Sequence, residues 1–486
     1  MKSKITLTSI LIAILILVSD CKKDPPPPIA DFSFTGDNAP APCDITFTSS
    51  STNADSYYWE FGDGTNSKEK NPKHTYNTEG TYSVKLTAEG EGGANSISKS
   101  LVILEPEPTA ASINFTVVGD QDLEQIIYPS VLLGLANLIS ESNEDFFDFS
   151  IKNPKANTNL KIVIQSSSLN SETIFQTQMA IKGQTYTFSP LIKWNYATLK
   201  SLNQPGNVDI TFVCYINDKE IDRKNLRFGY RSANECVYGL IDTKGNYVDL
   251  KWMFAAFVNE DNPKIDELLG VTLSYNVVSN FIGYQGTETD VLKQVSALWY
   301  YLQAHSVKYS SITASSNPSQ RVFSQYVRFF NDVYNNTQAN CVDGSVFLAS
   351  ILKKIGINPL LITVPGHMYL GYYTLQDKSK IRLLETTAVG QVNLAEIYED
   401  DVYVYNLTKY KNYITDQTWN DYFSGIISLN TVKREISYNN FIEATNYQIS
   451  DYNSNISNFN DPNNHDYKSY DIDELRKIVQ PIGNKK

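Results

Sequence analysis

Hydrophobic and polar residues alternate along much of the first half of the chain, which is the pattern of half-buried strands. In the N-terminal part, turns rich in Gly, Asn and Ser separate short segments of this kind: 30–34, 45–49, 57–61, 81–88 and 97–104. This spacing predicts an all-β sandwich over residues 30–104. A second β-rich sandwich is predicted over residues 111–235 from similar alternation at 161–165, 174–181, 185–188 and 208–216.

The second half of the chain changes to helical spacing, beginning with a predicted helix over residues 251–269. A stronger pattern follows residue 340, where apolar side chains recur every three or four positions: Val342, Val346, Ala349, Leu352 and Ile355. Asn340 suits the N-cap, Asp343 the third helical position and Gly356 the stop. The helix is therefore expected to begin at Cys341, where free backbone N–H groups and the positive end of the helix dipole favour a thiolate.

Three strands are predicted after that helix: 360–364, 367–373 and 381–384. His367 opens the second strand, and Glu385 follows the third. If these strands pair as hairpin neighbours, His367 and Glu385 lie side by side on one face. Packing of the Cys341 helix against that sheet brings a thiol, an imidazole and a carboxylate together, as in a nucleophile, base and orienting group. Taken singly, a Cys in an apolar helix is usually a core residue and a His on a strand is usually structural.

A run of residues in the first predicted sandwich closely resembles the PKD domain. The run is Trp59-Glu60-Phe61-Gly62-Asp63-Gly64-Thr65, followed by His74-Thr75-Tyr76 and Gly80-Thr81-Tyr82. Trp59 suits the sandwich core, Gly62 and Gly64 allow positive φ, and Asp63 can cap the turn between them. A calcium site at Asp63 is the less favoured interpretation. The resemblance implies an immunoglobulin-like sandwich that serves surface proteins as a spacer or ligand-binding module.

The second half of the chain resembles the transglutaminase-like branch of the papain-like cysteine fold. The resemblance rests on Cys341 at a helix start, Gly356-Ile357-Asn358-Pro359, His367 opening a strand, and Glu385-Thr386-Thr387. It covers residues 288–390 and implies an α+β domain over residues 236–486, which helix and strand patterns in the tail complete. Glu385 stands where the family more often has Asp.

This resemblance implies that Cys341 is the nucleophile, His367 the base and Glu385 the group that orients the imidazole. The backbone N–H of Cys341, with the side chain of Gln338 or Asn340, would face the oxyanion. Attack on an amide or peptide bond gives a thioester. Water then makes the protein a peptidase or amidase, and an amine makes it a transglutaminase-like acyltransferase.

An alternative hypothesis is a non-catalytic binding or adhesion protein of the cell surface. In that case the PKD module and a degenerate transglutaminase-like domain serve as ligand platforms. The enzyme hypothesis implies a protein, peptide or peptidoglycan-type amide substrate, while the PKD module implies a carbohydrate or surface-protein ligand. Neither hypothesis implies a cofactor or a metal ion.

The first 21 residues predict a targeting segment instead of a folded element. Lys2 and Lys4 precede an apolar run over residues 5–18, and Cys21 follows it. This arrangement resembles a bacterial lipoprotein signal, in which Cys21 receives the lipid and becomes the mature N-terminus. The linker over residues 22–29 contains four consecutive prolines and is expected to be stiff and extended. These features predict a lipid-anchored protein of the bacterial cell envelope, in the outer membrane and facing the periplasm or the surface, with secretion as the alternative.

Composition narrows the classes of partner. The 486 residues include 41 Lys and Arg against 53 Asp and Glu, a net charge of −12, and they contain no basic block. Nucleic acid is therefore excluded as a partner, because its binding needs clustered positive charge. Five cysteines without a Cys-x-x-Cys or His-x-x-x-His motif give no indication of structural zinc. Cys214 and Cys236 either pair in an oxidising compartment or remain two buried thiols.

Overall fold

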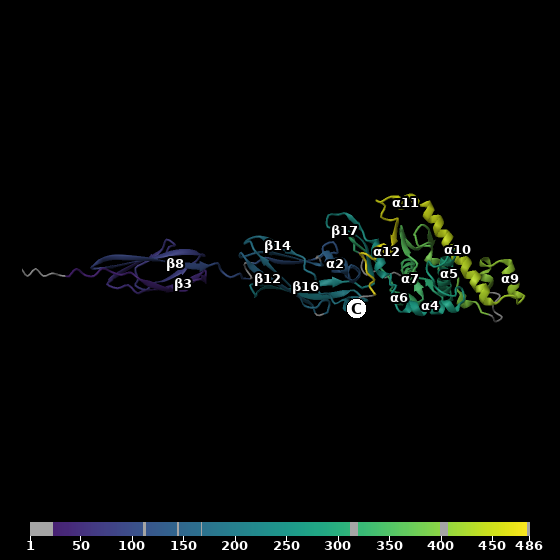
Figure 1. Ribbon diagram of the computed structural model, residues 1–486, viewed down its shortest axis with the longest axis horizontal. Helices are drawn as coiled ribbons and strands as arrows, with labels where there is room; N and C mark the ends of the chain where they lie inside the picture. The colour runs from purple at the N-terminus through teal and green to yellow at the C-terminus, as the bar shows by residue number, and fades with distance from the viewer. Residues whose placement is uncertain are drawn as a thin grey trace, which may run out of the picture. The chain divides into compact units, whose positions relative to one another are not determined.

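The computed structural model describes residues 23–109, 113–142, 145–166, 168–311, 319–398 and 407–483. The predicted signal segment and Cys21 lie outside these residues. The chain divides into two compact units, which Figure 1 displays in chain order from purple to yellow. The first unit takes the described residues up to Thr109 with Pro154–Ala156 and Ile181–Gly183, and the second takes the rest.

The first unit is a β-sandwich of two sheets. One sheet has the order β2-β8-β7-β4-β5 and the other β1-β3-β6. The strands are β1 Phe32–Thr35, β2 Ala39–Pro40, β3 Cys43–Ser49, β4 Ser56–Glu60, β5 Asn66–Ser67, β6 Lys73–Tyr76, β7 Gly80–Gly90 and β8 Gly93–Leu104. Alternation of buried and exposed residues along β3 and β7 follows the predicted pattern, because every second side chain points into the sandwich.

The predicted turn motif of the first unit has the expected geometry. Trp59 is fully buried, and its ring centroid lies 5.0 Å from that of Phe32. Gly62 and Gly64 have φ of +85° and +89°. Asp63 accepts hydrogen bonds from the Thr65 backbone N–H at 3.0 Å and pairs with His74 Nε2 at 2.7 Å. The Asp63 carboxylate therefore has protein partners that stabilise the turn.

The second unit begins with a β-sandwich of its own. Its sheets have the orders β10-β16-β15-β12-β13 and β14-β11-β9. The elements are β9 Phe115–Gly119, β10 Ile126–Ile127, α1 Pro129–Gly134, α2 Ala136–Ser142, β11 Phe147–Lys152, β12 Thr158–Ser166, β13 Thr173–Met179, β14 Thr185–Phe188, α3 Tyr196–Ser201, β15 Gly206–Ile216 and β16 Lys219–Tyr230. Cys214 and Cys236 are both buried free thiols, so the alternative of a bridge between them is wrong.

Helices and three further sheets form the rest of the described second unit. The elements up to the predicted nucleophile are β17 Glu235–Ile241, β18 Tyr247–Asp249, η3 Lys251–Phe257, α4 Lys264–Ser274, α5 Glu288–Ala304, β19 Lys308–Tyr309, β20 Val322–Tyr326, α6 Phe330–Asn336 and β21 Gln338–Ala339. The helix predicted over residues 251–269 is instead a 3₁₀ helix, η3, and the start of α4. Pro263 lies between them. A proline has no backbone N–H to donate, and its ring clashes with the carbonyl four residues before it, so a helix does not continue through this position.

The remaining elements begin with the helix that starts at Cys341. They are α7 Cys341–Lys354, β22 Pro359–Val364, β23 His367–Tyr373, β24 Ile381–Leu384, η4 Thr386–Gln391, η5 Leu394–Glu396, η6 Lys411–Tyr413, α9 Asp416–Phe423, α10 Leu429–Ser454, α11 Ile456–Asn460, β25 Lys468–Asp471 and α12 Ile472–Leu475. The predicted helix from Cys341 and the three predicted strands are therefore confirmed.

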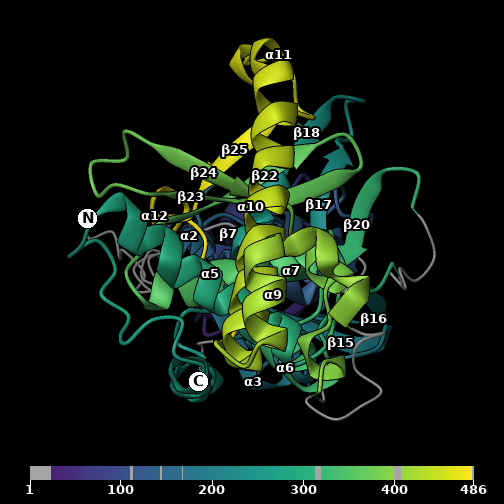
Figure 2. The ribbon, with the colours of Figure 1, turned by 90° about the vertical axis from the view of Figure 1, so that its right-hand side faces the viewer.

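An antiparallel sheet of order β24-β23-β22-β25 supports the candidate site. Helix α7 contacts β22 and β23, while α10 contacts β24 and α5. Figure 2 shows α10, in yellow, running past α5 and α7. The tail, where the sequence predicts helix and strand, contributes β25 to this sheet.

One buried cluster runs from Phe115 in the β-sandwich to Ile482 near the end of the described chain. The predicted boundary at residues 235 and 236 falls inside this second unit and stays a prediction.

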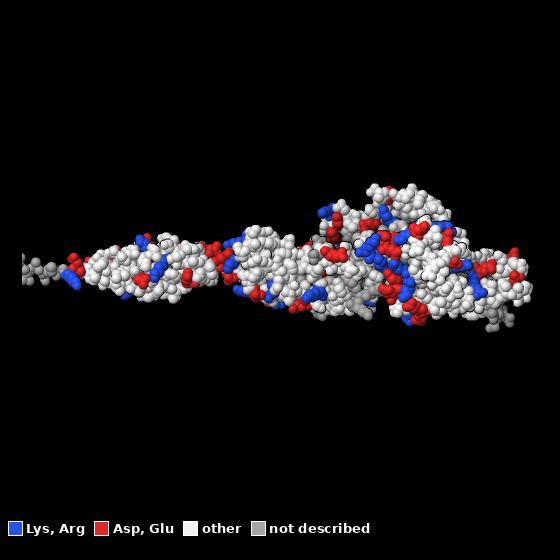
Figure 3. Space-filling model, in the orientation of Figure 1, with Lys and Arg blue, Asp and Glu red and all other residues white. Residues whose placement is uncertain are grey.

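In the face of the second unit seen in Figure 3, Lys and Arg side chains lie among Asp and Glu side chains. Within the described residues, no helix has both the length and the apolar character needed to cross a membrane.

Candidate active site

A capping box fixes Cys341 in the first turn of α7. Asn340 Oδ1 accepts a hydrogen bond from the Asp343 backbone N–H at 2.8 Å, and the Asn340 N–H donates to Asp343 Oδ2 at 3.0 Å. The fully buried Asp343 also forms an ion pair of 2.6 Å with Arg328. Because these contacts hold the start of the helix, the half-buried Cys341 side chain has a defined position at its N-terminus.

His367 and Glu385 meet across two paired strands. Gly366, with φ of +69°, ends the turn before β23, so that His367 is the first residue of that strand. The register of β23 and β24 pairs Leu370 with Leu384, which places Glu385 close to the His367 side chain. His367 Nε2 lies 2.8 Å from Glu385 Oε2.

The Cys341 side chain is the third member of this group. The pKa of His367 is raised to about 10, first by its hydrogen bond with Cys341 and then by the one with Glu385, which together outweigh the effect of burial. Since Nε2 donates to Glu385, Nδ1 is the nitrogen left to contact the Cys341 sulfur. A thiol, an imidazole and a carboxylate that are far apart in the sequence therefore come together.

The carboxylate of Glu385 is fully engaged by its neighbours. Oε1 accepts hydrogen bonds from the backbone N–H of Thr387, at 3.0 Å, and from its hydroxyl. Oε2 accepts one from Gln448 Nε2 in addition to the one from His367. Burial raises the pKa of Glu385, but the hydrogen bonds from His367 and Thr387 outweigh this effect and hold it below its ordinary value. Glu385 is thus a charged acceptor at neutral pH.

Sequence reasoning missed Gln448 as a partner of Glu385. The two residues are 63 positions apart, and Gln448 belongs to the buried face of α10. Only its place in the apolar spacing of that helix could have indicated that it points inward. Thr387 was within reach of the sequence analysis, because Thr and Ser hydroxyls commonly hydrogen-bond a carboxylate two residues before them.

The two predicted oxyanion residues differ in position. Gln338 lies exposed on β21 and lines neither of the two cavities at Cys341. Asn340 is 4% exposed and lines one of these cavities together with Cys341. Its Oδ1 caps α7, while its Nδ2 has no hydrogen-bond partner in the described residues. Asn340 is therefore the better placed of the two.

Cavities open on both sides of the sulfur and the imidazole. One, of about 400 Å³, is lined by Cys341 and His367 and by aromatic side chains: Tyr238, Tyr247, Phe254 and Phe323. A second, of about 350 Å³, shares Cys341, Gly366 and Tyr238 with the first and includes Asn340. A third, of about 450 Å³, is lined by His367 and Glu385 but not by Cys341. The cavities at Cys341 expose its side chain to a groove.

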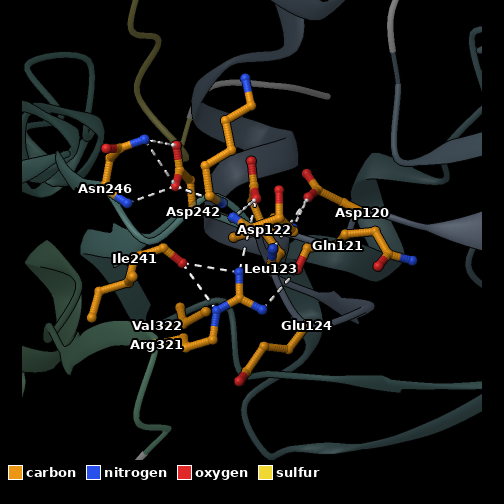
Figure 4. Close-up of polar contacts among 12 residues, drawn as sticks. Asp120, Gln121, Asp122, Leu123, Glu124, Ile241, Asp242, Asn246, Arg321 and Val322 are labelled. Atoms are coloured by element: carbon orange, nitrogen blue, oxygen red, sulfur yellow. Dashed lines mark hydrogen bonds and ion pairs between the residues drawn. The ribbon is translucent and has the colours of Figure 1, made fainter.

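A polar network fixes the sheet that carries three of the four aromatic side chains of this groove, Tyr238, Tyr247 and Phe323. That sheet has the order β18-β17-β20. Figure 4 shows the Arg321 guanidinium at the end of β17, where Nη2 donates to the Ile241 carbonyl at 2.9 Å. The same group lies 3.9 Å from Asp122, and Asp242 accepts a hydrogen bond from the Asn246 N–H at 2.8 Å in the β17–β18 turn. The wall opposite Cys341 is therefore tied at its end to the loop before β10.

Potential metal ligands form no cluster in the part of the chain that the structure describes. In residues 23–109, 113–142, 145–166, 168–311, 319–398 and 407–483, no group of three or more His, Cys, Asp or Glu side chains could hold a metal ion. In the first unit, Asp63 has the Thr65 and His74 partners described above.

Comparisons with known proteins identify the first unit. A family model described as a PKD domain matches residues 25–103. The chain has a PKD domain at its N-terminus. This match agrees with the sequence resemblance at Trp59 and the turn that follows, and it ends before the residues of the candidate site.

The curated relatives share only a small part of their length with this chain. Collagenase ColA of Bacillus cereus is 34% identical over 100 residues, which are 21% of this chain and 10% of the collagenase. Collagenase ColA of Clostridium perfringens is 33% identical over 116 residues, 24% of this chain and 10% of that protein. The chain therefore spans about a tenth of the length of these relatives.

Solved structures of PKD domains are also similar to part of the chain. The PKD1 domain of the Vibrio cholerae metalloprotease PrtV is 26% identical, and the match covers 16% of this chain and 95% of that domain with a TM-score of 0.14. The PKD domain of the human receptor SorCS2 is 20% identical, with coverage of 17% and 78% and a TM-score of 0.16.

Proposed function

We propose that the second unit is a thiol-dependent enzyme that acts on amide or peptide bonds. The observation that carries this proposal is the convergence of Cys341, His367 and Glu385 beside an open groove. The resemblance to the transglutaminase-like branch of the papain-like cysteine fold agrees with it. In this proposal the protein is a peptidase, an amidase or a transglutaminase-like acyltransferase.

The first half-reaction transfers the acyl group to sulfur. His367 Nδ1 takes the Cys341 proton, and the sulfur attacks the carbonyl carbon of the substrate to form a C–S bond and an oxyanion. The backbone N–H of Cys341 and the Nδ2 group of Asn340 donate hydrogen bonds to that oxyanion. The oxyanion then collapses, the C–N bond breaks, and the leaving amine takes the proton from Nδ1. The products are a thioester on Cys341 and a free amine.

The second half-reaction releases the acyl group. His367 removes a proton from water or from an acceptor amine, which attacks the thioester carbon. The C–S bond then breaks and restores the thiolate next to the imidazolium. Water gives a carboxylic acid, and an amine gives a new amide. Glu385 keeps Nε2–H directed to itself throughout and so maintains the imidazole orientation.

We place this activity in the bacterial cell envelope. The Cys21 motif and the proline-rich linker support a lipid anchor, and a PKD domain is a module of surface proteins by the resemblance given above. In this proposal the PKD domain contributes as a spacer or as a binding module for a carbohydrate or surface protein.

Alkylation of the cysteines tests the catalytic proposal. Iodoacetamide at pH 6, followed by peptide mass spectrometry, should modify Cys341 at least about tenfold faster than Cys43, since thiolate character controls the rate. Both side chains are partly exposed, and burial and then Asp44 raise the pKa of Cys43. His367→Ala should slow the reaction of Cys341 and leave that of Cys43 unchanged.

The opposite result would favour the non-catalytic hypothesis. Burial raises the pKa of Cys214 to about 12, and it raises that of Cys236 as well, so both should react only after unfolding. A Cys341 that stays as inert as these two in the folded protein would rule out the thiol mechanism.

A further inference from the structure

The cavity on the His367 side has an unusual balance of charge. Its lining includes three carboxylates, from Glu385, Glu443 and Asp451, but neither Lys nor Arg. The His367 imidazolium pairs with Glu385. Within the described chain, neither Glu443 nor Asp451 takes part in an ion pair, and the partner of Glu443 is the neutral Tyr413 hydroxyl. Two negative charges therefore remain without a cation in this cavity.

A buried hydrogen-bond acceptor accompanies these charges. Gln448 lines the same cavity, is 2% exposed, and has no hydrogen-bond partner for Oε1 in the described residues. Its orientation is fixed, because Nε2 donates to Glu385. An unpaired buried carbonyl oxygen has an energetic cost that a donor from a ligand would remove.

One face of α10 presents all of these groups except Glu385. Glu443, Tyr447, Gln448 and Asp451 all line the cavity from this helix, and their spacing of three or four residues puts them on one side of it. Glu443 and Asp451 are about two turns apart, with Gln448 between them. The Tyr447 ring is 67% exposed and adds an aromatic surface that attracts cations.

The chemistry of the proposed reaction identifies which part of a substrate reaches this cavity. The acyl group is bonded to Cys341, which lines the other two cavities and not this one. The amine that leaves or enters exchanges its proton with His367, which lines both this cavity and the first cavity at Cys341. An amine portion that continues past His367, away from Cys341, therefore enters the cavity beside α10.

We propose that the α10 cavity is a subsite for a primary ammonium group on the amine side of the substrate, such as a lysine-type side chain. This inference rests on the proposed function. An ammonium has three N–H donors, which Gln448 Oε1 and the nearer of the two carboxylates accept, while the second carboxylate attracts it through its charge. The substrate class is thus an amide whose amine portion carries a second, protonated amine.

A binding experiment tests this subsite without turnover. The Cys341→Ala variant of the full chain is titrated by calorimetry with N-acetyl-lysine methylamide and with the uncharged N-acetyl-norleucine methylamide. We expect the lysine probe to bind at least about fivefold more tightly, and the ratio to fall as NaCl is raised from about 0.05 to 0.5 M.

Charge-neutralising variants complete the test. Glu443→Gln with Asp451→Asn, in the same background, should bring the lysine-to-norleucine ratio close to one. Glu172→Gln removes one exposed charge in the β-sandwich and should keep the ratio. Equal binding of both probes, or a preference that survives the double substitution, overturns the subsite. Failure of the proposed function has a different signature, which is slow alkylation of Cys341 in the unmodified protein.

Discussion

His367 Nε2 and Glu385 Oε2 lie 2.8 Å apart, where His367 opens β23 and Glu385 directly follows its antiparallel neighbour β24. The other hydrogen bonds to the Glu385 carboxylate hold it in place for this pair. Thr387 holds one carboxylate oxygen, and Gln448 shares the other with the imidazole. These contacts orient the imidazole, which also forms a hydrogen bond with Cys341 at the start of α7.

The free energy of unfolding should fall at alkaline pH, because His367 loses its charge there. Its folded-state pKa of about 10 lies above the ordinary value of 6.5. The stabilisation is therefore fully present below about pH 6.5 and is lost as the pH rises through 10. Denaturant unfolding at pH 7 and pH 10 should show a loss of about 3–4 kcal/mol in the unmodified protein that His367→Ala lacks. Cys341→Ala should reduce this loss, because the Cys341 hydrogen bond is the first cause of the raised pKa. Equal pH dependence in all three proteins would contradict the assignment.

Gln448 should act as a positioning residue for Glu385. Gln448→Leu leaves a buried carboxylate oxygen with one donor fewer, so we expect the free energy of unfolding to fall by about 1–3 kcal/mol. Alkylation of Cys341 should slow several-fold and its pH profile should shift, which a purely structural defect would not cause. Asn446→Leu, at an exposed position of the same helix, is the matched control and should alter neither measurement. An unchanged pH profile in Gln448→Leu would remove Gln448 from the site.

The buried pair of Asp343 and Arg328 should be important for the start of α7. Asp343→Asn leaves the Arg328 charge with less compensation and weakens the capping box, so we expect a loss of about 2–4 kcal/mol in unfolding free energy. Asp266→Asn breaks the exposed pair with Lys354 and should change the value by less than about 0.5 kcal/mol. Chemical denaturation of both variants provides the comparison. A similar effect of the two substitutions would contradict the inference.

The PKD domain should fold independently of the second unit. Its core around Trp59 is a separate buried cluster. Trp59→Ala should lower the stability of this domain by about 3–5 kcal/mol. Limited proteolysis should then cut the first unit while Cys341 in the second unit keeps its alkylation rate. A parallel loss of Cys341 reactivity would show that the two units depend on each other.

The local parts of the fold could be predicted from the sequence because their causes are local. The start of α7 follows from Asn340 and Asp343, which are neighbours along the chain. The hairpin that brings His367 to Glu385 uses short connections, so alternation alone aligns its strands. The same reasoning explains the PKD turn, where Gly62 and Gly64 take the positive φ that their type allows.

The distant parts of the site could not be predicted, since they depend on packing between segments far apart in the chain. Gln448 reaches Glu385 only because α10 packs on β24. The aromatic wall of Tyr238, Tyr247 and Phe323 lies opposite Cys341 because a separate sheet stands there. The break at Pro263 had a visible cause, but the helical pattern on either side of it concealed the interruption.

The strand β25 is the last part of its sheet to be synthesised. It pairs with β22, and the contact between Thr363 and Lys468 joins residues 105 positions apart. A nascent chain that has emerged only as far as Glu385 already contains the sulfur, the imidazole and the carboxylate, yet the outer edge of β22 still lacks its partner. An unpaired strand edge exposes backbone N–H and C=O groups that can pair with another chain and cause aggregation. The sheet that positions His367 is therefore complete only after β25 has been synthesised, long after the residues of the candidate site have left the ribosome.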